Sequence, residues 1–203
     1  MPQPVTKEQI EFFRALAARR QDGARLRHTQ GVARAALALA ARHGAGANEA
    51  EAAALLHDMM KGTPFAEQIA MARAQGLLRG PEDEEMPQTL HGRLTAAWLR
   101  REYAELPPEI AAAVENHTLG RPGMGPLEMI IYSADLTEEG RDFFGLDILR
   151  RKLYDDLAEG TLACMDSTIK RLQAEGKPIH SLTLAARADL RRRLGIDADE
   201  RNI

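Results

Sequence analysis

The stretch AALLHDMMKG (residues 53–62) ends an alanine- and leucine-rich run with an imidazole and a carboxylate side by side. Burying either group is costly unless it finds a polar partner or an ion. Neighbouring residues on an α-helix diverge by about 100°, so His57 and Asp58 can bind one ion only near a helix end or from opposite sides of it. Their position one turn before Gly62 permits the first arrangement and predicts a metal site.

Around this stretch the chain has the composition of a helical protein. Helix-forming residues dominate, and aromatic residues make up only 4%. A capping box at Thr6–Gln9 predicts the start of the first helix. Further predicted helices run from an interruption at Gly23 to about His43, from Asn48 to Gly62 and Pro64, from about Leu90 to Tyr103, from Pro107-Pro108 to about His117, and from Pro126 to about Glu139.

The C-terminal part, about 147–195, predicts one long helix and a shorter one, separated by EGKPIHS. The most loop-like internal segment is 76–88. No strand pattern is found, so the fold class is all-α. The 203 residues suit a single domain, with a core at about 24–140 and the C-terminal helices as an extension.

Charge and cysteine content narrow the class of protein. The formal net charge of −3 provides no field that would favour nucleic acid or an acidic membrane. Cys164 is the only cysteine, so one chain can form neither a disulfide nor a thiolate zinc site, and we interpret it as a small buried hydrophobic residue. No apolar run approaches membrane-spanning length. We expect a soluble, cytoplasmic protein.

Four further positions extend the pattern of the first pair. His28 lies in RLRHTQGV, His91 in TLHGRL, His117 in VENHTLG and Asp135 in IIYSADL. His28 and Asp135 lie in or beside apolar helix segments and should face inward, whereas the other two lie at predicted helix ends from which they can reach a cleft. A divalent cation satisfies several such groups at once and keeps the imidazoles neutral.

Each of these residues alone has a simpler explanation. An inward-facing histidine is more often a hydrogen-bonded core residue than a ligand, and a lone aspartate is more often a helix cap. The combination of four histidines and two aspartates in an all-helical chain favours metal binding. His43 is the contrast: in the last turn before Gly44, it suits the negative end of a helix dipole and is assigned no chemistry.

The order of these residues resembles that of the HD-domain superfamily of metal-dependent phosphohydrolases, and within it the YqeK-type bacterial enzymes. The similarity rests on RLRHTQGVA, AALLHDMMK, LHG, VENHTLGRPGM, IIYSADLTEEGRDF and GKPIHSLTLAAR, and covers roughly residues 8–194. It implies an HD-domain helical bundle with a C-terminal helical extension. The implied activity is a symmetrical bis(5'-nucleosyl)-tetraphosphatase, which converts diadenosine tetraphosphate and related dinucleoside polyphosphates into two ADP.

The resemblance also implies roles for single residues. His28, His57, Asp58 and Asp135 would hold one or two iron ions, and His91 and His117 would complete a second metal position or contact phosphate. Nitrogen and oxygen ligands without a thiolate suit manganese or zinc as well. The implied catalytic residues are Asp58, Lys61, His91 and His117. The implied substrate-binding residues are Arg25, His28, Lys61, His91, His117, Asp135, Leu136, Arg141, Pro178, Ile179, His180, Ser181, Leu182 and Thr183.

Some of these assignments have an alternative. Arg25, Lys61 and Arg141 could be ordinary solvated charges, although a spacing of three residues would place Lys61 on the helix face of Asp58. His180 could be a loop histidine. Glu139 stands where a proline is usual in the family. Phe144 and the methionines of HDMMK are further departures, so the loop after Asp135 could differ in shape, but none removes a ligand.

Other functions remain open at this stage. One is another HD-type nucleotide phosphohydrolase, such as a 5'-deoxynucleotidase or a guanosine-polyphosphate hydrolase. Another is a non-catalytic HD module that binds nucleotide, which is disfavoured because degenerate members usually lose a ligand. A third is a purely structural helical protein with core histidines. The chain could also form a homodimer.

Overall fold

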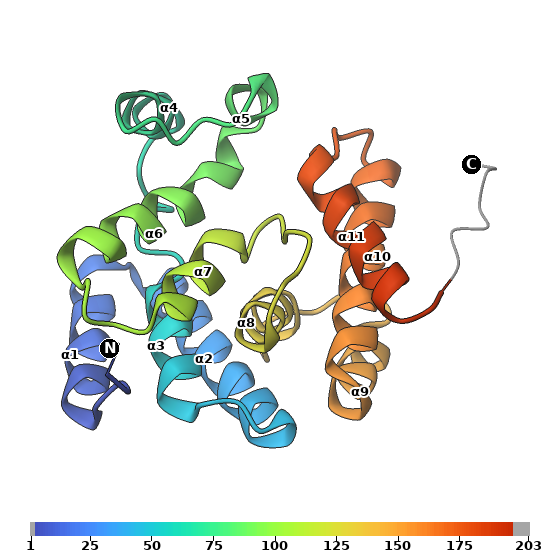
Figure 1. Cartoon of the computed structure of the whole chain (residues 1–203), viewed down its shortest axis with the longest axis horizontal. Helices are drawn as coiled ribbons and strands as arrows, with labels where there is room; N and C mark the ends of the chain where they lie inside the picture. Colours follow the sequence, from blue (N-terminus) through green and yellow to red (C-terminus); the bar gives the residue numbers. More distant parts are fainter. Residues whose placement is uncertain (1–2, 197–203) are drawn as a thin grey trace.

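The structure is a computed structural model that describes residues 3–196. Within that range the chain forms eleven α-helices, one short 3₁₀ helix and no strand (Figure 1). The predicted all-α fold class is therefore confirmed. None of the helices in the described range has the length and apolar character that crossing a bilayer requires.

The first two helices agree closely with the sequence pattern. Helix α1 (Lys7–Arg20) begins with the predicted capping box, in which Thr6 Oγ1 accepts from Gln9 N at 3.2 Å. Helix α2 (Gly23–His43) ends, as predicted, at Gly44, where φ is 70°. The predicted break between the two helices is present, but it lies at Gln21 and Asp22, and Gly23 is the first residue of α2.

The third helix begins differently from the prediction. Helix α3 (Ala47–Leu56) has Gly46 as its N-cap, so the prediction that Asn48 opens this helix was wrong. The Asn48 side chain instead donates to the Val5 carbonyl at 2.7 Å, which holds the N-terminal segment against the helix start. Asn48, a residue type typical of helix caps, thus makes a long-range contact instead.

The end of α3 also comes earlier than the glycine pattern predicts. The helix stops at Leu56 rather than at Gly62, and the intervening residues form turns. Backbone bonds of three-residue spacing, such as Lys61 N to Asp58 O at 3.1 Å, replace the helical pattern there. The histidine–aspartate pair therefore sits just beyond a helix end.

The next region contains more helix than expected. Helix α4 (Phe65–Ala74) follows the turns, and α5 (Pro81–Glu85) and the 3₁₀ helix η1 (Pro87–Thr89) lie within the segment 76–88 that we expected to be a loop. A proline at the first position favours both short elements, because its fixed φ suits a helix start. Helix α6 (Leu90–Glu102) then begins where predicted.

Two central helices follow. Helix α7 (Pro108–Asn116) and helix α8 (Pro126–Thr137) both start at predicted prolines and end within two residues of the predicted positions. The turn-rich LGRPGMG segment separates them, with Gly120 and Gly123 in the left-handed region at φ of 70° and 72°. Both helices contribute to the core.

The C-terminal part has three helices rather than two: α9 (Leu146–Asp155), α10 (Leu157–Ala174) and α11 (Ser181–Arg193). The long helix expected from 147 is broken at Asp156, whose backbone is extended and whose side chain accepts from Glu159 N at 2.8 Å. An N-cap inside a continuous helical pattern was the signal that the sequence analysis missed.

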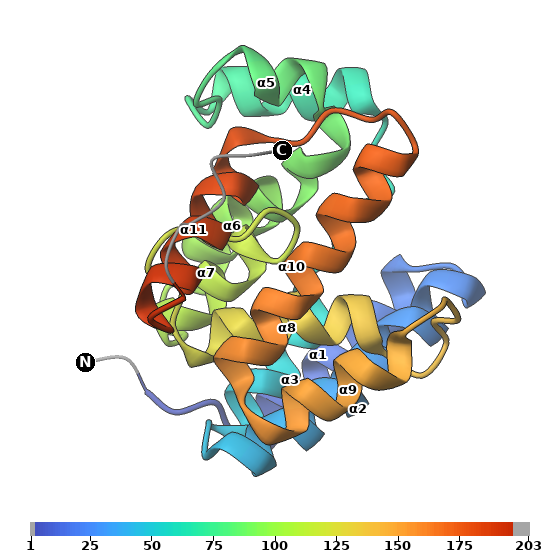
Figure 2. The same cartoon turned by 90° about the vertical axis from the view of Figure 1, so that its right-hand side faces the viewer.

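One main core joins these elements. It contains fully buried side chains from α1, α3, α7, α8 and α10, namely Phe13, Leu56, Ile110, Ile130 and Met165. Helix α8 lies between the group formed by α2, α3 and α7 and the C-terminal helices (Figure 1), and α10 passes across it (Figure 2). The C-terminal helices therefore pack on the same core as the rest.

Two residues set aside in the sequence analysis have structural positions. Cys164 is fully buried, and burial raises the pKa of its thiol to about 12, which confirms its role as a small core residue. His43 lies in the last turn of α2, as expected, and its Nε2 is 2.6 Å from the Leu153 carbonyl. That contact ties α2 to α9.

Helices α9 and α10 approach each other closely at Gly160. A Cβ added there would lie 2.4 Å from Cα of Leu153 and 2.5 Å from its backbone nitrogen. Backbone atoms cannot move aside as a flexible side chain can. Gly160 is thus required by the packing of these two helices.

We expect Gly160→Ala to lower the free energy of unfolding by about 1–3 kcal/mol, because the added methyl group overpacks the contact. Urea unfolding followed by circular dichroism measures this loss. Gly62→Ala is the matched control, since a Cβ at Gly62 meets nothing within 4 Å. Equal stability of the Gly160 variant and the unsubstituted protein would contradict the close packing.

Candidate metal centre

The structure brings together all six residues that the sequence analysis selected as ligands or as their neighbours. They form three overlapping groups of three, and in each group the ligand atoms lie within 4.8 Å of one another. These residues come from five segments of the chain, and most of them lie at or near the end of a helix. The six are His28 on α2, His57 and Asp58 after α3, His91 at the start of α6, His117 directly after α7, and Asp135 near the end of α8.

Three of the four imidazoles are oriented in the same way. In each, Nδ1 lies within hydrogen-bond distance of the backbone carbonyl three residues earlier, which can only accept. Nδ1 therefore carries the proton, and Nε2 keeps its lone pair for the site, as in metal-binding histidines. The pairs are His57 with Ala54 at 2.6 Å, His91 with Gln88 at 2.9 Å and His117 with Val114 at 2.7 Å.

The Nε2 atoms surround the carboxylate of Asp58, whose side chain is only 1% exposed. His91 Nε2 lies 3.2 Å from Oδ1, and His57 Nε2 lies 3.6 Å from Oδ2. These are short ion-pair distances, but neither carboxylate oxygen has a partner in hydrogen-bond geometry. Nε2 of His28 and Nε2 of His57 also lack one. Unsatisfied buried acceptors of this kind are expensive.

Two further contacts also bring acceptor atoms face to face. His91 Nε2 and His117 Nε2 lie 3.1 Å apart, although both Nδ1 atoms already hold the ring protons. His28 Nε2 lies 3.0 Å from Asp135 Oδ1. Two facing lone pairs repel unless a proton or a cation lies between them. The clustered nitrogen and oxygen acceptors thus fit a divalent metal ion, which accepts electron pairs from all of them.

The protonation states agree with this fit. Burial lowers the pKa of His57 to about 4, so the imidazole is neutral near pH 7 and able to bind a metal. Burial alone would raise the pKa of Asp58, but neighbouring groups, among them the ammonium of Lys61 at 3.0 Å, outweigh it and hold this pKa well below its ordinary value. Asp58 is therefore ionised, as a metal ligand would need to be.

Cationic side chains lie around the cluster. Lys61 Nζ is 3.0 Å and Arg25 Nη1 is 3.8 Å from Asp58 Oδ2. Lys61 lies three residues after Asp58, as predicted, but the turn after α3 rather than a shared helix face brings the two side chains together. Arg141 Nη2 donates to Asp135 Oδ1 at 2.9 Å, and its Nε donates to the Asp135 carbonyl. Arg141 thus orients a candidate metal ligand.

A cavity of about 650 Å³ adjoins the cluster, and His117 and Asp135 line both. Of the residues expected to bind substrate, several line this cavity: His117, Asp135, Leu136, Arg141, Pro178, His180 and Thr183. Others lie around the cluster instead, namely Arg25, His28, Lys61 and His91. The remaining three, Ile179, Ser181 and Leu182, are not among its lining residues.

At one edge of this cavity, the start of α11 contacts α5 through His180 and Ser181. His180 is the N-cap of α11, with Nδ1 accepting from Leu182 N at 3.1 Å and Nε2 lying 3.4 Å from Asp83 Oδ1. Ser181 donates to Glu82 through its backbone and its hydroxyl. His180 is therefore an N-cap residue fixed by these contacts in the cavity wall, rather than a loop histidine without a structural role.

Much of the cavity wall consists of residues that were not predicted from the sequence. Helix α10 contributes Ser167, Thr168 and Arg171, which share one helix face by their spacing, and this polar face within an apolar helix was the available signal. Other missed lining residues lie in separate segments and follow no local pattern. They are Met86, Gln88, Thr89, Thr118, Leu119, Tyr132, Phe143, Phe144 and Leu172.

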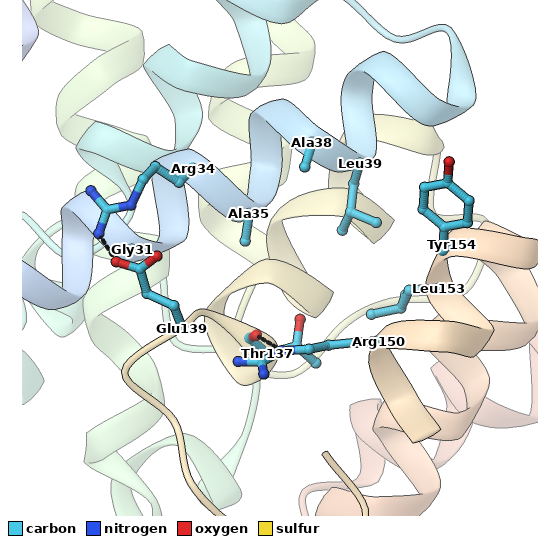
Figure 3. Close-up of a pocket in the computed structure, with 10 residues that line it drawn as sticks. All are labelled: Gly31, Arg34, Ala35, Ala38, Leu39, Thr137, Glu139, Arg150, Leu153 and Tyr154. Carbon is cyan, nitrogen blue, oxygen red and sulfur yellow. Dashed lines mark hydrogen bonds and ion pairs between the residues drawn. The ribbon is translucent and has the colours of Figure 1, made fainter. Parts of the chain in front are cut away.

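A second cavity of about 320 Å³ lies between α2, the end of α8 and α9 (Figure 3). Its charged groups are already engaged, since Arg34 pairs with Glu139 and Arg150 donates to the Thr137 carbonyl. No histidine is among its lining residues in the described part of the chain. The larger cavity, beside the cluster, is therefore the candidate functional site.

Comparison with known proteins agrees with this geometry. The family model described as HD domain matches residues 25–166. Relatives named "Bis(5'-nucleosyl)-tetraphosphatase, symmetrical" include one from Bacillus subtilis, 34% identical over 75% of this chain and 81% of the relative, and one from Halalkalibacterium halodurans, 33% identical over 79% and 86%. A third, from Staphylococcus aureus, is 31% identical over 72% of this chain and 75% of the relative.

A solved structure extends the likeness to the fold. A predicted HD superfamily hydrolase involved in NAD metabolism from Clostridium acetobutylicum is 32% identical, with a TM-score of 0.83 over 94% of this chain and 100% of that chain. The match includes the C-terminal helices as well as the helices that carry the cluster. This chain belongs to the HD-domain family.

Proposed function

We propose that the protein is a metal-dependent hydrolase that splits diadenosine tetraphosphate symmetrically into two ADP. The observation that carries the proposal is the buried Asp58 carboxylate, which has no hydrogen bond and faces several imidazole nitrogens beside a cavity of about 650 Å³. The names of three relatives at 31–34% identity support this choice of substrate.

The proposed metal ligands are His28, His57, Asp58 and Asp135, with a second position between His91 and His117. We propose iron, as the family resemblance implies, while the same donor set would accept manganese or zinc. A divalent metal bound there supplies Lewis acidity and a water whose pKa is lowered toward neutrality. The roles of the protein side chains follow from their positions around the ligands.

The cationic side chains around the cluster would neutralise the polyphosphate. Lys61 and Arg25, on one side of Asp58, can offset charge that develops on the phosphoryl group under attack. Arg141 keeps Asp135 in place through two hydrogen bonds and lines the cavity. Arg171, on α10, also lines the cavity and can contact phosphates of the leaving ADP. His117 connects the cluster to the cavity.

The cavity also has surfaces for the nucleosides. Tyr132, Phe143 and Leu172 offer apolar area on which a purine base can pack, and Ser167 and Thr168 offer hydroxyl groups. We place the activity in the cytoplasm, because nucleotide substrates are found there and the single buried thiol of Cys164 suits a reducing compartment.

We expect Asp58→Ala to abolish metal binding and activity together, because it removes the ligand that all the cluster groups face. Metal content by mass spectrometry and ADP release from diadenosine tetraphosphate measure the two effects. Asp147→Ala, at an exposed position on α9, is the control and should retain both. Full turnover and full metal content in the Asp58 variant would refute the assignment.

The products test the proposed reaction. Diadenosine tetraphosphate should yield ADP alone, because symmetrical cleavage leaves two identical halves. Chromatography of the products distinguishes this result from ATP plus AMP. The same protein should turn over 5'-deoxynucleoside monophosphates and guanosine polyphosphates at least about tenfold more slowly, a difference of roughly 1.4 kcal/mol in activation free energy. Faster turnover of either would favour that alternative activity.

A further inference from the structure

The fourth imidazole of the cluster is held differently from the other three. His28 Nδ1 has no backbone carbonyl as its partner and instead lies 3.2 Å from Oε1 of Glu138. Glu138 directly follows α8, only 4% of it is exposed, and 110 residues separate it from His28 in sequence. No role was predicted for Glu138 from the sequence.

The surroundings of Glu138 are shaped to hold its carboxylate. Gly140 N donates to Oε2, and Arg141 Nε lies 3.6 Å from Oε1. Helix α2 leaves room at Gly31, where a Cβ would lie 2.3 Å from Glu138 Oε2. A glycine in the middle of a helix costs stability relative to alanine, and here it allows the carboxylate to approach α2 beside His28.

We propose that Glu138 is a positioning residue for the metal centre. This proposal depends on the metal site of the proposed function. Its carboxylate accepts the Nδ1 proton of His28 and thereby fixes the tautomer in which Nε2 has a free lone pair. It also turns the ring toward Asp58 and Asp135 and increases the electron density at Nε2. Carboxylates behind metal-binding imidazoles have this effect generally.

The end of α8 has another anchor that does not involve this side chain. Arg150, on α9, donates from Nε to the Thr137 carbonyl and from Nη2 to the Glu138 carbonyl, both at 2.8 Å. Figure 3 shows Arg150 reaching the end of α8, with Glu139 directed to Arg34. Because the backbone is held by Arg150, the Glu138 carboxylate is available for His28 rather than needed to end the helix.

The first test changes the carboxylate itself. Glu138→Ala should weaken the affinity of the metal-free protein for Mn²⁺ by about 10- to 100-fold, as measured by competition with a chelator. Glu138→Gln should lose less, because its amide oxygen can still accept from Nδ1. The control is Glu139→Gln at the exposed neighbouring position, which should bind Mn²⁺ like the unsubstituted protein.

A second readout separates positioning from general structure. Nitrogen-15 NMR of the metal-free protein should show His28 protonated at Nδ1 in the unsubstituted protein and in Glu139→Gln. In Glu138→Ala the His28 signals should change toward those of the tautomer protonated at Nε2, because Asp135 Oδ1 lies 3.0 Å from that nitrogen, while those of His57, His91 and His117 should stay unchanged. Those three rings have their own carbonyl partners.

A third variant disturbs the contact without removing the carboxylate. Gly31→Ala would force Glu138 away from α2 and should also weaken Mn²⁺ binding, while the helix itself should not lose stability. Gly23→Ala, in the same helix, is its control, because the added Cβ meets only the flexible end of Arg27 at 3.4 Å. Equal loss in both glycine variants would overturn the proposal.

The outcomes also separate this proposal from the proposed function. If the unsubstituted protein binds Mn²⁺ and Glu138→Ala binds it equally well with an unchanged His28 tautomer, the role of Glu138 is refuted and the metal site stands. If the unsubstituted protein binds no divalent metal, both proposals fail. Selective loss of affinity together with the tautomer change at His28 would support the positioning role.

Discussion

The buried carboxylate of Asp58 is the constraint on which the site depends. It lies among the Nε2 nitrogens of three imidazoles whose ring protons are on Nδ1 and are donated to backbone carbonyls. These Nε2 nitrogens therefore have no proton to donate to the carboxylate. Such an arrangement of acceptor atoms is unfavourable in the metal-free protein and favourable around a divalent cation. The stability of this region and its chemistry are therefore expected to depend on the same ion.

Helix ends make this convergence possible. His57 and Asp58 follow the last turn of α3, His117 follows α7, and His91 is the second residue of α6. At a helix end the backbone changes direction, so adjacent residues can point to one place, and the exposed carbonyls of the last turn are free to orient imidazoles. The early end of α3 is thus part of the site.

The C-terminal helices extend the candidate site beyond the histidine–aspartate cluster. Helix α10 forms one wall of the larger cavity, and the start of α11 forms another through His180 and Thr183. Through Arg150, helix α9 holds the end of α8, next to Glu138 and its contact with His28. The extension thus contributes both to the larger cavity and to the placement of a candidate ligand, which agrees with a structural match over 94% of the chain.

The sequence by itself determined the helical class and most helix starts, because capping residues, prolines and apolar periodicity act locally, and it also predicted the residues that the structure brings together as candidate ligands. It predicted the helix after Thr6 and the starts of α7 and α8 at prolines, but not the break at Asp156 or the helix at 81–85. Only the tertiary structure decided that α10 lines the cavity, that Arg141 binds Asp135 and that Glu138 contacts His28. These are contacts between distant segments, and packing rather than local propensity brings such residues together.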